Sequence, residues 1–345
     1  AVWVNSTSGE TYVCTDATTD ANIWTNVGGG SGDIAPIPPY QFGGSNYAYC
    51  AAGWSTTTGG NTAVIERYNF ASSVTVQGWG STLISDHAQC SIGSTTEGFL
   101  VGGSGAGNAG VLGTKINKYS FISSGNATDV GDLAEVAGVP NGISGELYGY
   151  TMGGTNSSGS TKAIQKFAWT SSGGAVVATD VGDAYAGMTA GSTYAASCSS
   201  GYHGYTMGGP TATGDNTRIE KLSFATDVAV AYGGSLSTGR DGNTGAASTT
   251  HGYCWVVTTG FGRQIETFSF ASEGTATVLT SELDSDRQFG GGHSSTTHGY
   301  VDGGYTGAME TQIDRFAFSN DTIQNEVGHL GTPKAYSSTG SGSQY

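Results

Sequence analysis

One short phrase returns six times along the chain and sets the main limit on its fold. It consists of an isoleucine, polar residues and two aromatic positions near its end. The six copies are IERYNF at Ile65, INKYSF at Ile116, IQKFAW at Ile164, IEKLSF at Ile219, IETFSF at Ile265 and IDRFAF at Ile313. Successive isoleucines are 51, 48, 55, 46 and 48 residues apart. Such a period indicates an array of similar structural units.

Two further phrases keep the phase of the first. A Gly-Gly phrase comes earlier in each unit: EGFLVGG ending at Gly103, YGYTMGG at Gly154, HGYTMGG at Gly209 and HGYVDGG at Gly304. A Val/Leu phrase follows, as in ATDVGDL from Ala127. Each unit therefore predicts four short strands: a small-residue strand, the GY..GG strand, the aromatic strand and a Val/Leu strand. Four strands in a period of about 40 to 50 residues are typical of a β-propeller blade.

The composition favours strands over helices. Gly contributes 59 of the 345 residues, and Lys and Arg together only 12. Good helix formers such as Leu, Lys, Glu and Gln are scarce, whereas Ser, Thr, Tyr and Val are frequent, which favours strands joined by tight turns. The two aromatic positions of the repeated phrase share one strand face, so we expect them to pack between neighbouring units. The expected fold is all-β, a six-bladed β-propeller with a small N-terminal β module.

The combination of GY..GG with a following aromatic strand resembles kelch-type β-propeller repeats from about residue 40 to the C-terminus. The usual Trp near the end of each kelch repeat is missing, and only Trp169 lies in that neighbourhood, so the resemblance is to a divergent, kelch-like member. The cadence HGY..GG, I.KF.F, ATDVGDL also resembles propeller-bearing structural and tail-fibre proteins of bacteriophages that infect marine cyanobacteria. This resemblance implies a non-enzymatic protein of the virion surface, outside the cell.

The two ends depart from the repeat. Residues 1–33 contain the runs VWVN, TYVC and NIWTNV, which predict two or three strands in a separate module. We expect residues 1–32 to bind other virion proteins or sister subunits, because so small a module rarely buries a core alone. Near the other end, LGTPKAYSS from Leu330 copies LDSDRQFGG from Leu283. Residues 34–345 are therefore predicted to form the propeller, closed by a C-terminal strand paired into the first blade.

Charge and cysteine content exclude several function classes. The formal net charge is −15, which argues against nucleic acid as a partner. No run of about 20 apolar residues occurs, so no membrane insertion is expected. The five cysteines have no C-x-x-C spacing, which excludes a zinc ribbon, and their odd number favours buried free thiols.

Candidate catalytic and metal-ligating residues are dispersed by the repeat. His203, His251 and His298 occupy one position of successive HGY phrases, which would spread them around a propeller. Acids such as Asp129 and Asp132 lack the EF-hand pattern and are interpreted as turn caps. No hydrolase motif occurs, and the Tyr, His and Cys ligands of the copper-oxidase branch of kelch propellers cannot be assembled from the pattern. We expect no catalytic residue, no metal and no cofactor.

Basic residues fall in two phases of the repeat. Nine lie on or just before the aromatic strand, and we expect exposed ion pairs with acids such as Glu66 and Asp314. Arg240, Arg287 and Lys334 instead lie in the loop that leads into the next unit. In a propeller these loops and those after Gly-Gly emerge on one side, where aromatic, amide and charged groups suit sugar rings. The predicted ligand-binding residues are Trp54, Tyr305, Arg240, Arg287, Asn156 and Asp215.

The leading functional hypothesis is a phage tail fibre or other surface appendage whose propeller loops recognise a host-surface glycan. The alternatives are a cellular extracellular adhesin and a polysaccharide-active enzyme on the same fold. For the loop residues themselves, ordinary polar loops without a ligand are the competing interpretation.

Overall fold

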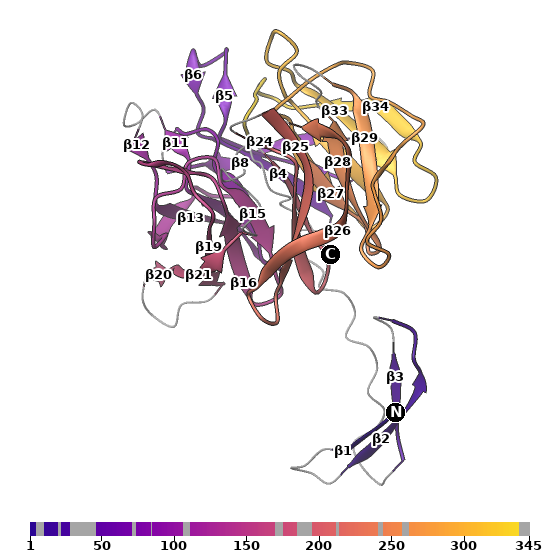
Figure 1. Cartoon of the computed structure of the whole chain (residues 1–345). Coiled ribbons are helices and arrows are strands. Elements are labelled where there is room, and N and C mark those ends of the chain that lie inside the picture. Colours follow the sequence, from indigo (N-terminus) through magenta and orange to yellow (C-terminus); the bar gives the residue numbers. More distant parts are fainter. Residues whose placement is uncertain are drawn as a thin grey trace. The chain divides into compact units, whose positions relative to one another are not determined.

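The computed structural model describes residues 1–4, 10–19, 22–27, 46–70, 74–83, 85–105, 111–169, 175–184, 195–211, 214–240, 244–256 and 262–337. Every regular element in these ranges is a β-strand, which confirms the predicted all-β class (Figure 1). Within the same ranges there is no helix long and apolar enough to cross a membrane. The chain divides into two compact units, Ala1–Pro39 and Tyr40–Tyr345. The predicted domain boundary at residues 33 and 34 lies outside the described residues.

The N-terminal unit is an antiparallel sheet in the order β1-β2-β3, formed by β1 (Val2–Val4), β2 (Thr11–Asp16) and β3 (Ile23–Asn26). Tyr12 is buried, and its ring centroid lies 5.3 Å from that of Trp3. Five large apolar side chains of this small sheet are exposed: Val2, Trp3, Val4, Ile23 and Val27. The unit therefore leaves much apolar surface uncovered by its own strands.

Six sheets follow one another through the described part of the second unit, and they are numbered here 1 to 6 in chain order. Sheet 1 has the order β4-β7-β8, formed by β4 (Tyr47–Ala51), β7 (Val64–Asn69) and β8 (Val76–Ser81). Sheet 2 contains β9 (Cys90–Gly93), β10 (Glu97–Val101), β13 (Lys115–Ser120) and β14 (Thr128–Asp132), with β20 (Val176–Val177) added parallel to β14. Sheet 3 contains β15 (Asn141–Ser144), β16 (Tyr148–Met152), β19 (Ala163–Ala168) and β21 (Thr179–Asp183).

Sheets 4 to 6 repeat this plan. Sheet 4 contains β22 (Ala196–Ser199), β23 (His203–Met207), β25 (Gly214–Ser223) and β26 (Ala229–Arg240). Sheet 5 contains β27 (Gly245–Ala247), β28 (His251–Val256), β29 (Gln264–Ser269) and β30 (Thr277–Val278). Sheet 6 contains β31 (Gly291–Ser294), β32 (His298–Asp302), β33 (Gln312–Ala317) and β34 (Ile323–His329). In sheets 2 to 6 the strands follow the predicted order, with the small-residue strand first and the aromatic strand third, whereas the described part of sheet 1 begins with the GY..GG-type strand β4.

Short hairpins extend from one end of these sheets, between the GY..GG strand and the aromatic strand (Figure 1). They are β5 (Trp54–Ser55) with β6 (Gly60–Asn61), β11 (Ser104–Gly105) with β12 (Val111–Leu112), and β17 (Thr155–Asn156) with β18 (Gly159–Ser160). In sheet 4, β24 (Pro210–Thr211) pairs with the start of β25. The loop residues predicted to bind a ligand belong to this end.

The core lies between successive sheets, as the aromatic pattern predicts. In each described interface a side chain of the GY..GG strand packs against the aromatic strand of the next sheet. The contacts are Tyr49 with Tyr119, Phe99 with Phe167, Tyr150 with Leu222, Tyr205 with Phe268, Tyr253 with Phe316, and Tyr300 with Tyr68. The last of these joins sheet 6 to sheet 1. Burial of each such side chain contributes about 1.5–3 kcal/mol to folding.

Small residues in the first strands allow the sheets to approach closely. β15 lies beside β9 and β22, β27 lies beside β22 and β31, and β31 lies beside β4. A Cβ atom on Gly142 would come within 2.7 Å of the carbonyl oxygen of Ser91, and one on Gly292 within 2.3 Å of that of Gly245. Larger residues there would push neighbouring sheets apart, which explains why the first strand of each unit is rich in Gly, Ser and Ala.

The C-terminal copy of the repeat start lies against sheet 1. Trp54 and Ala335 exchange two backbone hydrogen bonds, of 2.8 and 3.0 Å, and the Lys334 ammonium lies 2.9 Å from a Glu66 carboxylate oxygen. The predicted closing strand would follow in residues 338–345, which lie outside the described residues. Residues 330–337 therefore connect the last repeat to the first, independently of any pairing by residues 338–345.

Candidate functional site

Trp54, Tyr305 and Asn156 lie at the same end of their sheets, one or two residues after a Gly-Gly or Ala-Gly pair. The last glycine of each pair has a left-handed φ, +108° at Gly53, +104° at Gly154 and +103° at Gly304. A Cβ atom on Gly154 would lie 2.6 Å from the carbonyl oxygen of Gly138, so glycine is required there for space as well as for conformation. The turn directs the next residues toward the loop that leads into a first strand.

These next residues are held by one repeated backbone contact. Isolated antiparallel bridges join Trp54 to Ala335, Thr155 to Gly138 and Tyr305 to Gln288. Trp54 is 39% exposed, whereas Asn156 and Tyr305 are partly buried. The Asn156 side chain accepts a hydrogen bond of 2.9 Å from the Ser158 backbone N–H, which caps its own turn. The side chains of Arg240 and Asp215 lie outside the described residues, although the backbone of Arg240 pairs with Asn216 and that of Asp215 with Pro210.

A row of four aromatic rings begins at Trp54 and crosses from sheet 1 to the loops beside sheet 6. Ring centroids are 5.7 Å apart between Trp54 and His87, 6.0 Å between His87 and Tyr336, and 4.1 Å between the stacked rings of Tyr336 and Phe289. All four side chains keep some exposure to solvent. We call Trp54, His87, Tyr336 and Phe289 the aromatic row.

The aromatic row also connects Trp54 with Tyr305. The backbone N–H of Tyr336 donates to the carbonyl of Phe289 over 2.9 Å, and Gln288, next to Phe289, forms the bridge to Tyr305. The repeat pattern predicted Trp54 and Tyr305 as binding residues but not the other three rings. Phe289 and Tyr336 were detectable, because they occupy the same position in the copied segments LDSDRQF and LGTPKAY.

Backbone strain accompanies the aromatic row. Four residues at one repeat position have left-handed φ values without being glycine: Ala88 at 56°, Val139 at 50°, Phe289 at 58° and Tyr336 at 55°. Such conformations are costly for residues with a Cβ atom and persist only where the surroundings enforce them. Here the enforcement includes hydrogen bonds from one loop to the next, such as the 3.3 Å bond from the Ala88 N–H to the Tyr336 carbonyl. Both Tyr336 and Phe289 therefore leave the backbone from this conformation, and their rings stack on each other.

The loop cations beside the row point inward, which corrects the prediction of exposed pairs at Glu66 and Asp314. Arg287 is 4% exposed, forms an ion pair with buried Asp314, and donates to the carbonyls of Gly303 and Gln312 over 3.3 Å. Burial lowers the pKa of Arg287 to about 10. Lys334 pairs with Glu66 in the same way. Arg287 therefore lies beneath the surface where it was expected to contact a ligand.

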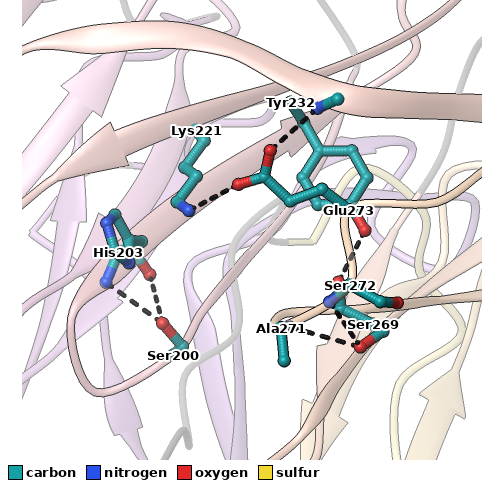
Figure 2. Close-up of polar contacts among 9 residues, drawn as sticks. Ser200, His203, Lys221, Tyr232, Ser269, Ala271, Ser272 and Glu273 are labelled. Carbon is teal, nitrogen blue, oxygen red and sulfur yellow. Dashed lines mark hydrogen bonds and ion pairs between the residues drawn. The ribbon is translucent and has the colours of Figure 1, made fainter. Parts of the chain in front are cut away.

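Two cations of the aromatic strands connect neighbouring sheets, whereas Lys115 and Lys118 pair with acids of their own sheet. Lys166 of sheet 3 lies 2.8 Å from Asp227 of sheet 4, and Lys221 of sheet 4 lies 2.7 Å from Glu273, after the aromatic strand of sheet 5. Figure 2 shows the second pair, with the Glu273 carboxylate facing the Lys221 ammonium. A hydrogen bond from Lys221 lowers the pKa of Glu273. These groups belong to the scaffold, as the sequence pattern predicts.

Asp86 occupies the repeat position of Arg287 and Lys334. Each of the three lies two residues before a residue with a left-handed φ, which is Ala88 in the case of Asp86. Asp86 is buried, it accepts a hydrogen bond of 2.6 Å from the His87 N–H, and burial raises its pKa to about 6. The native state therefore holds this proton more tightly than the unfolded chain, whose Asp pKa is near 3.8. The stability that protonated Asp86 contributes to the native state is fully present below about pH 4 and is lost as the pH rises through about 6.

Asp86→Asn should accordingly raise the free energy of unfolding at pH 8 by about 2 kcal/mol, because the variant buries no charge. The gain should disappear near pH 4, so the unfolding midpoint of the variant should change less between pH 4 and pH 8. Urea unfolding at both pH values measures this. Asp129→Asn, at a partly exposed carboxylate, is the matched control. Identical pH profiles for wild type and Asp86→Asn would contradict the raised pKa.

A second group of polar side chains is buried between sheets 1 and 6. The Asp302 Oδ2 atom lies 2.8 Å from His293 Nε2, 2.9 Å from Cys50 Sγ and 3.1 Å from the Tyr68 hydroxyl. Cys50 Sγ and His293 Nε2 are 3.6 Å apart. His293, Cys50 and Asp302 are all 0% exposed. The sequence pattern predicted no metal site, and it gave no signal for this group because its members come from opposite ends of the repeat array.

Comparison with protein-family models finds no match, and comparison with curated proteins finds none either. The kelch-like and phage resemblances therefore stay predictions. The geometry of the aromatic row and of the sheet 1 and sheet 6 interface provides the evidence for function.

Proposed function

We propose that sheets 1 to 6 are the blades of a kelch-like β-propeller and that the chain is a non-enzymatic virion structural protein, a tail fibre or other surface appendage. Support for six blades comes from the common strand order of the sheets and from first strands that lie side by side. The apolar cluster between sheets 6 and 1 adds to this support, because an open array would leave those two faces uncovered. The phage assignment rests on the sequence resemblance.

The observation that carries the binding proposal is the aromatic row. Four partly exposed rings lie in continuous contact at the end of the sheets where the hairpins and loops gather. Aromatic side chains combine a large apolar face with polar edges, which matches the apolar face and hydroxyl rim of a sugar ring. The strained loop backbone holds the rings in place before binding, which lowers the ordering cost. A host-surface glycan is the proposed ligand.

The charges near the row favour a neutral glycan. Arg287 and Lys334, in the two loops that carry Phe289 and Tyr336, are neutralised inside the protein by Asp314 and Glu66. The whole chain carries a formal net charge of −15, which would repel polyanionic sugars at long range. Affinity would then come from stacking, and several copies on one appendage would raise it through effective concentration.

We expect particles carrying Trp54→Ala together with Tyr305→Ala to adsorb to host cells at least about tenfold more slowly, since losing stacking at two rings costs roughly 1–3 kcal/mol. Adsorption kinetics and particle composition should be measured in parallel. Tyr202→Ala is the matched control, because Tyr202 is 47% exposed in the turn between β22 and β23, at the other end of sheet 4. Unaltered adsorption with normal assembly would contradict receptor binding through Tyr305 and through Trp54, the most exposed ring of the aromatic row.

We further propose that the N-terminal unit attaches the chain to other virion proteins or to sister subunits. Its exposed Val2, Trp3, Val4 and Ile23 are the support, because a sheet of this size gains little stability while such groups stay in water. A fragment of residues 1–39 should be unfolded as a monomer and should fold only on association. Circular dichroism with sedimentation measures both properties, and a folded monomer would argue against this role.

A further inference from the structure

We propose that Cys50, His293 and Asp302 bind a zinc ion that ties sheet 6 to sheet 1. One ligand atom from each residue lies within 4.8 Å of the other two, and all three side chains are buried. Cys50 lies on β4 and Asp302 on β32, while His293 lies on β31, so the ligands come from two sheets. Zinc at this point would cross-link residues that are 243 and 252 positions apart in the chain.

The repeat itself shows that packing does not require a histidine at this position. His293 faces the aromatic residue of the neighbouring strand, Tyr300, and this pairing exists in every described sheet with a first strand. The residues that face the same aromatic in sheets 2 to 5 are Ile92, Ile143, Cys198 and Ala246. A fully buried imidazole has therefore replaced an apolar or weakly polar side chain.

Asp302 departs from the repeat in the same way. It lies opposite Ile313, the first residue of the repeated phrase. The residues opposite that isoleucine in sheets 1 to 5 are Ala51, Val101, Met152, Met207 and Trp255. Burying a carboxylate destabilises the fold by several kcal/mol unless opposite charge and hydrogen bonds compensate it. This cost is about as large as that of breaking a buried ion pair. Two neighbouring polar replacements, His293 and Asp302, at positions that are mostly apolar in the other sheets indicate a binding site, because packing alone does not require them.

The charge of the interface leaves room for one cation. The other buried acids of sheets 1 and 6, Glu66 and Asp314, are each neutralised by a basic residue, Lys334 and Arg287. The partners of Asp302 are the imidazole of His293, the thiol of Cys50 and the hydroxyl of Tyr68, none of which carries a permanent positive charge. The Asp302 Oδ1 and His293 Nδ1 atoms have no hydrogen-bond partner among the described residues. The polar atoms of the group are therefore incompletely satisfied by one another.

A thiolate sulfur, an imidazole nitrogen and a carboxylate oxygen are the ligand types that zinc prefers in proteins. On binding, the Cys50 thiol loses its proton to solvent, and the ion accepts electron pairs from Sγ, His293 Nε2 and one Asp302 oxygen. Zn²⁺ with one thiolate, one carboxylate and a neutral imidazole has no net charge, which suits a buried site. Ligand atoms around tetrahedral zinc are about 3.3–3.8 Å apart, so the 2.8–3.6 Å separations here need only a small expansion. The three side chains leave the fourth position of the ion to a water molecule taken up as the site forms. The Tyr68 hydroxyl supports the carboxylate.

The test compares the full chain refolded from denaturant with zinc chloride and with a chelator, because a fully buried site loads while sheets 1 and 6 are apart. We expect one zinc per chain by elemental analysis and an unfolding midpoint at least roughly 5 °C higher with zinc. Refolding with Co²⁺ should give the absorption of a tetrahedral thiolate complex, and Cys50→Ser should lose it. Cys254→Ser is the matched control, since Cys254 lies opposite Glu266 as Cys50 lies opposite Glu66.

A second variant keeps the proposal testable if Cys50→Ser fails to fold. His293→Ile with Asp302→Met introduces the residues that sheet 3 has at these positions, Ile143 and Met152. We expect this variant to fold, to bind no zinc and to unfold at the same temperature with zinc or chelator. Retention of stoichiometric zinc by this variant would overturn the assignment, as would a wild-type chain that takes up no zinc and whose unfolding is insensitive to it.

Discussion

Replacing Arg287 by alanine should lower the free energy of unfolding by about 3–5 kcal/mol, because it leaves Asp314 buried without a cation. Both side chains are almost fully buried, at 2% and 0% exposure, so water cannot take over the role of the guanidinium. Asp314 would keep only its hydrogen bonds from the Gln312 side chain and the Glu326 N–H. Equilibrium unfolding in urea measures the loss.

The repeat supplies the control for Arg287→Ala. Sheet 3 has Ala137 two residues before its left-handed Val139, and Gln165 on the aromatic strand at the position of Asp314. Arg287→Ala combined with Asp314→Gln should therefore recover most of the lost stability. Arg263→Ala, at a half-exposed cation, should cost no more than about 1 kcal/mol. A stable Arg287→Ala single variant would contradict the role of the buried pair.

Deletion of residues 334–345 should have a still larger effect, lowering the free energy of unfolding by at least about 5 kcal/mol. It removes the cation of buried Glu66, the two backbone hydrogen bonds between Trp54 and Ala335, and the stacking of Tyr336 on Phe289. Because these contacts join the last repeat to the first, their loss should expose the interface of sheets 6 and 1. Thermal unfolding followed by tryptophan fluorescence measures the change.

A shorter deletion, of residues 338–345, separates the two contributions of the C-terminus. It keeps Lys334, Ala335 and Tyr336 and removes only the segment predicted to form the closing strand. If that strand pairs with sheet 1, the shorter deletion should also lower the melting temperature. An unchanged melting curve would show that residues 330–337 make the connection without it.

The period of the sequence determined what lies within one unit. Ile65, Ile116 and their equivalents predicted the aromatic strand, the glycine pairs predicted its turn, and the alternation of side chains predicted that Tyr68, Tyr119 and Phe316 would pack between sheets. These are local properties: strand propensity, left-handed turns and side-chain alternation act over a few residues. Because these local properties recur in each copy of the repeat, they could be predicted from the single sequence.

The tertiary structure alone decided which groups meet across units. The pattern placed Arg287 on the surface and Glu66 in an exposed pair. Instead, the loops that carry Arg287 and Lys334 fold these cations over the buried acids Asp314 and Glu66. The aromatic row and the group formed by Cys50, His293 and Asp302 both depend on the contact between the first and last repeats. Residues some 240 positions apart share no local signal. They come together only because sheet 6 buries its apolar face against sheet 1.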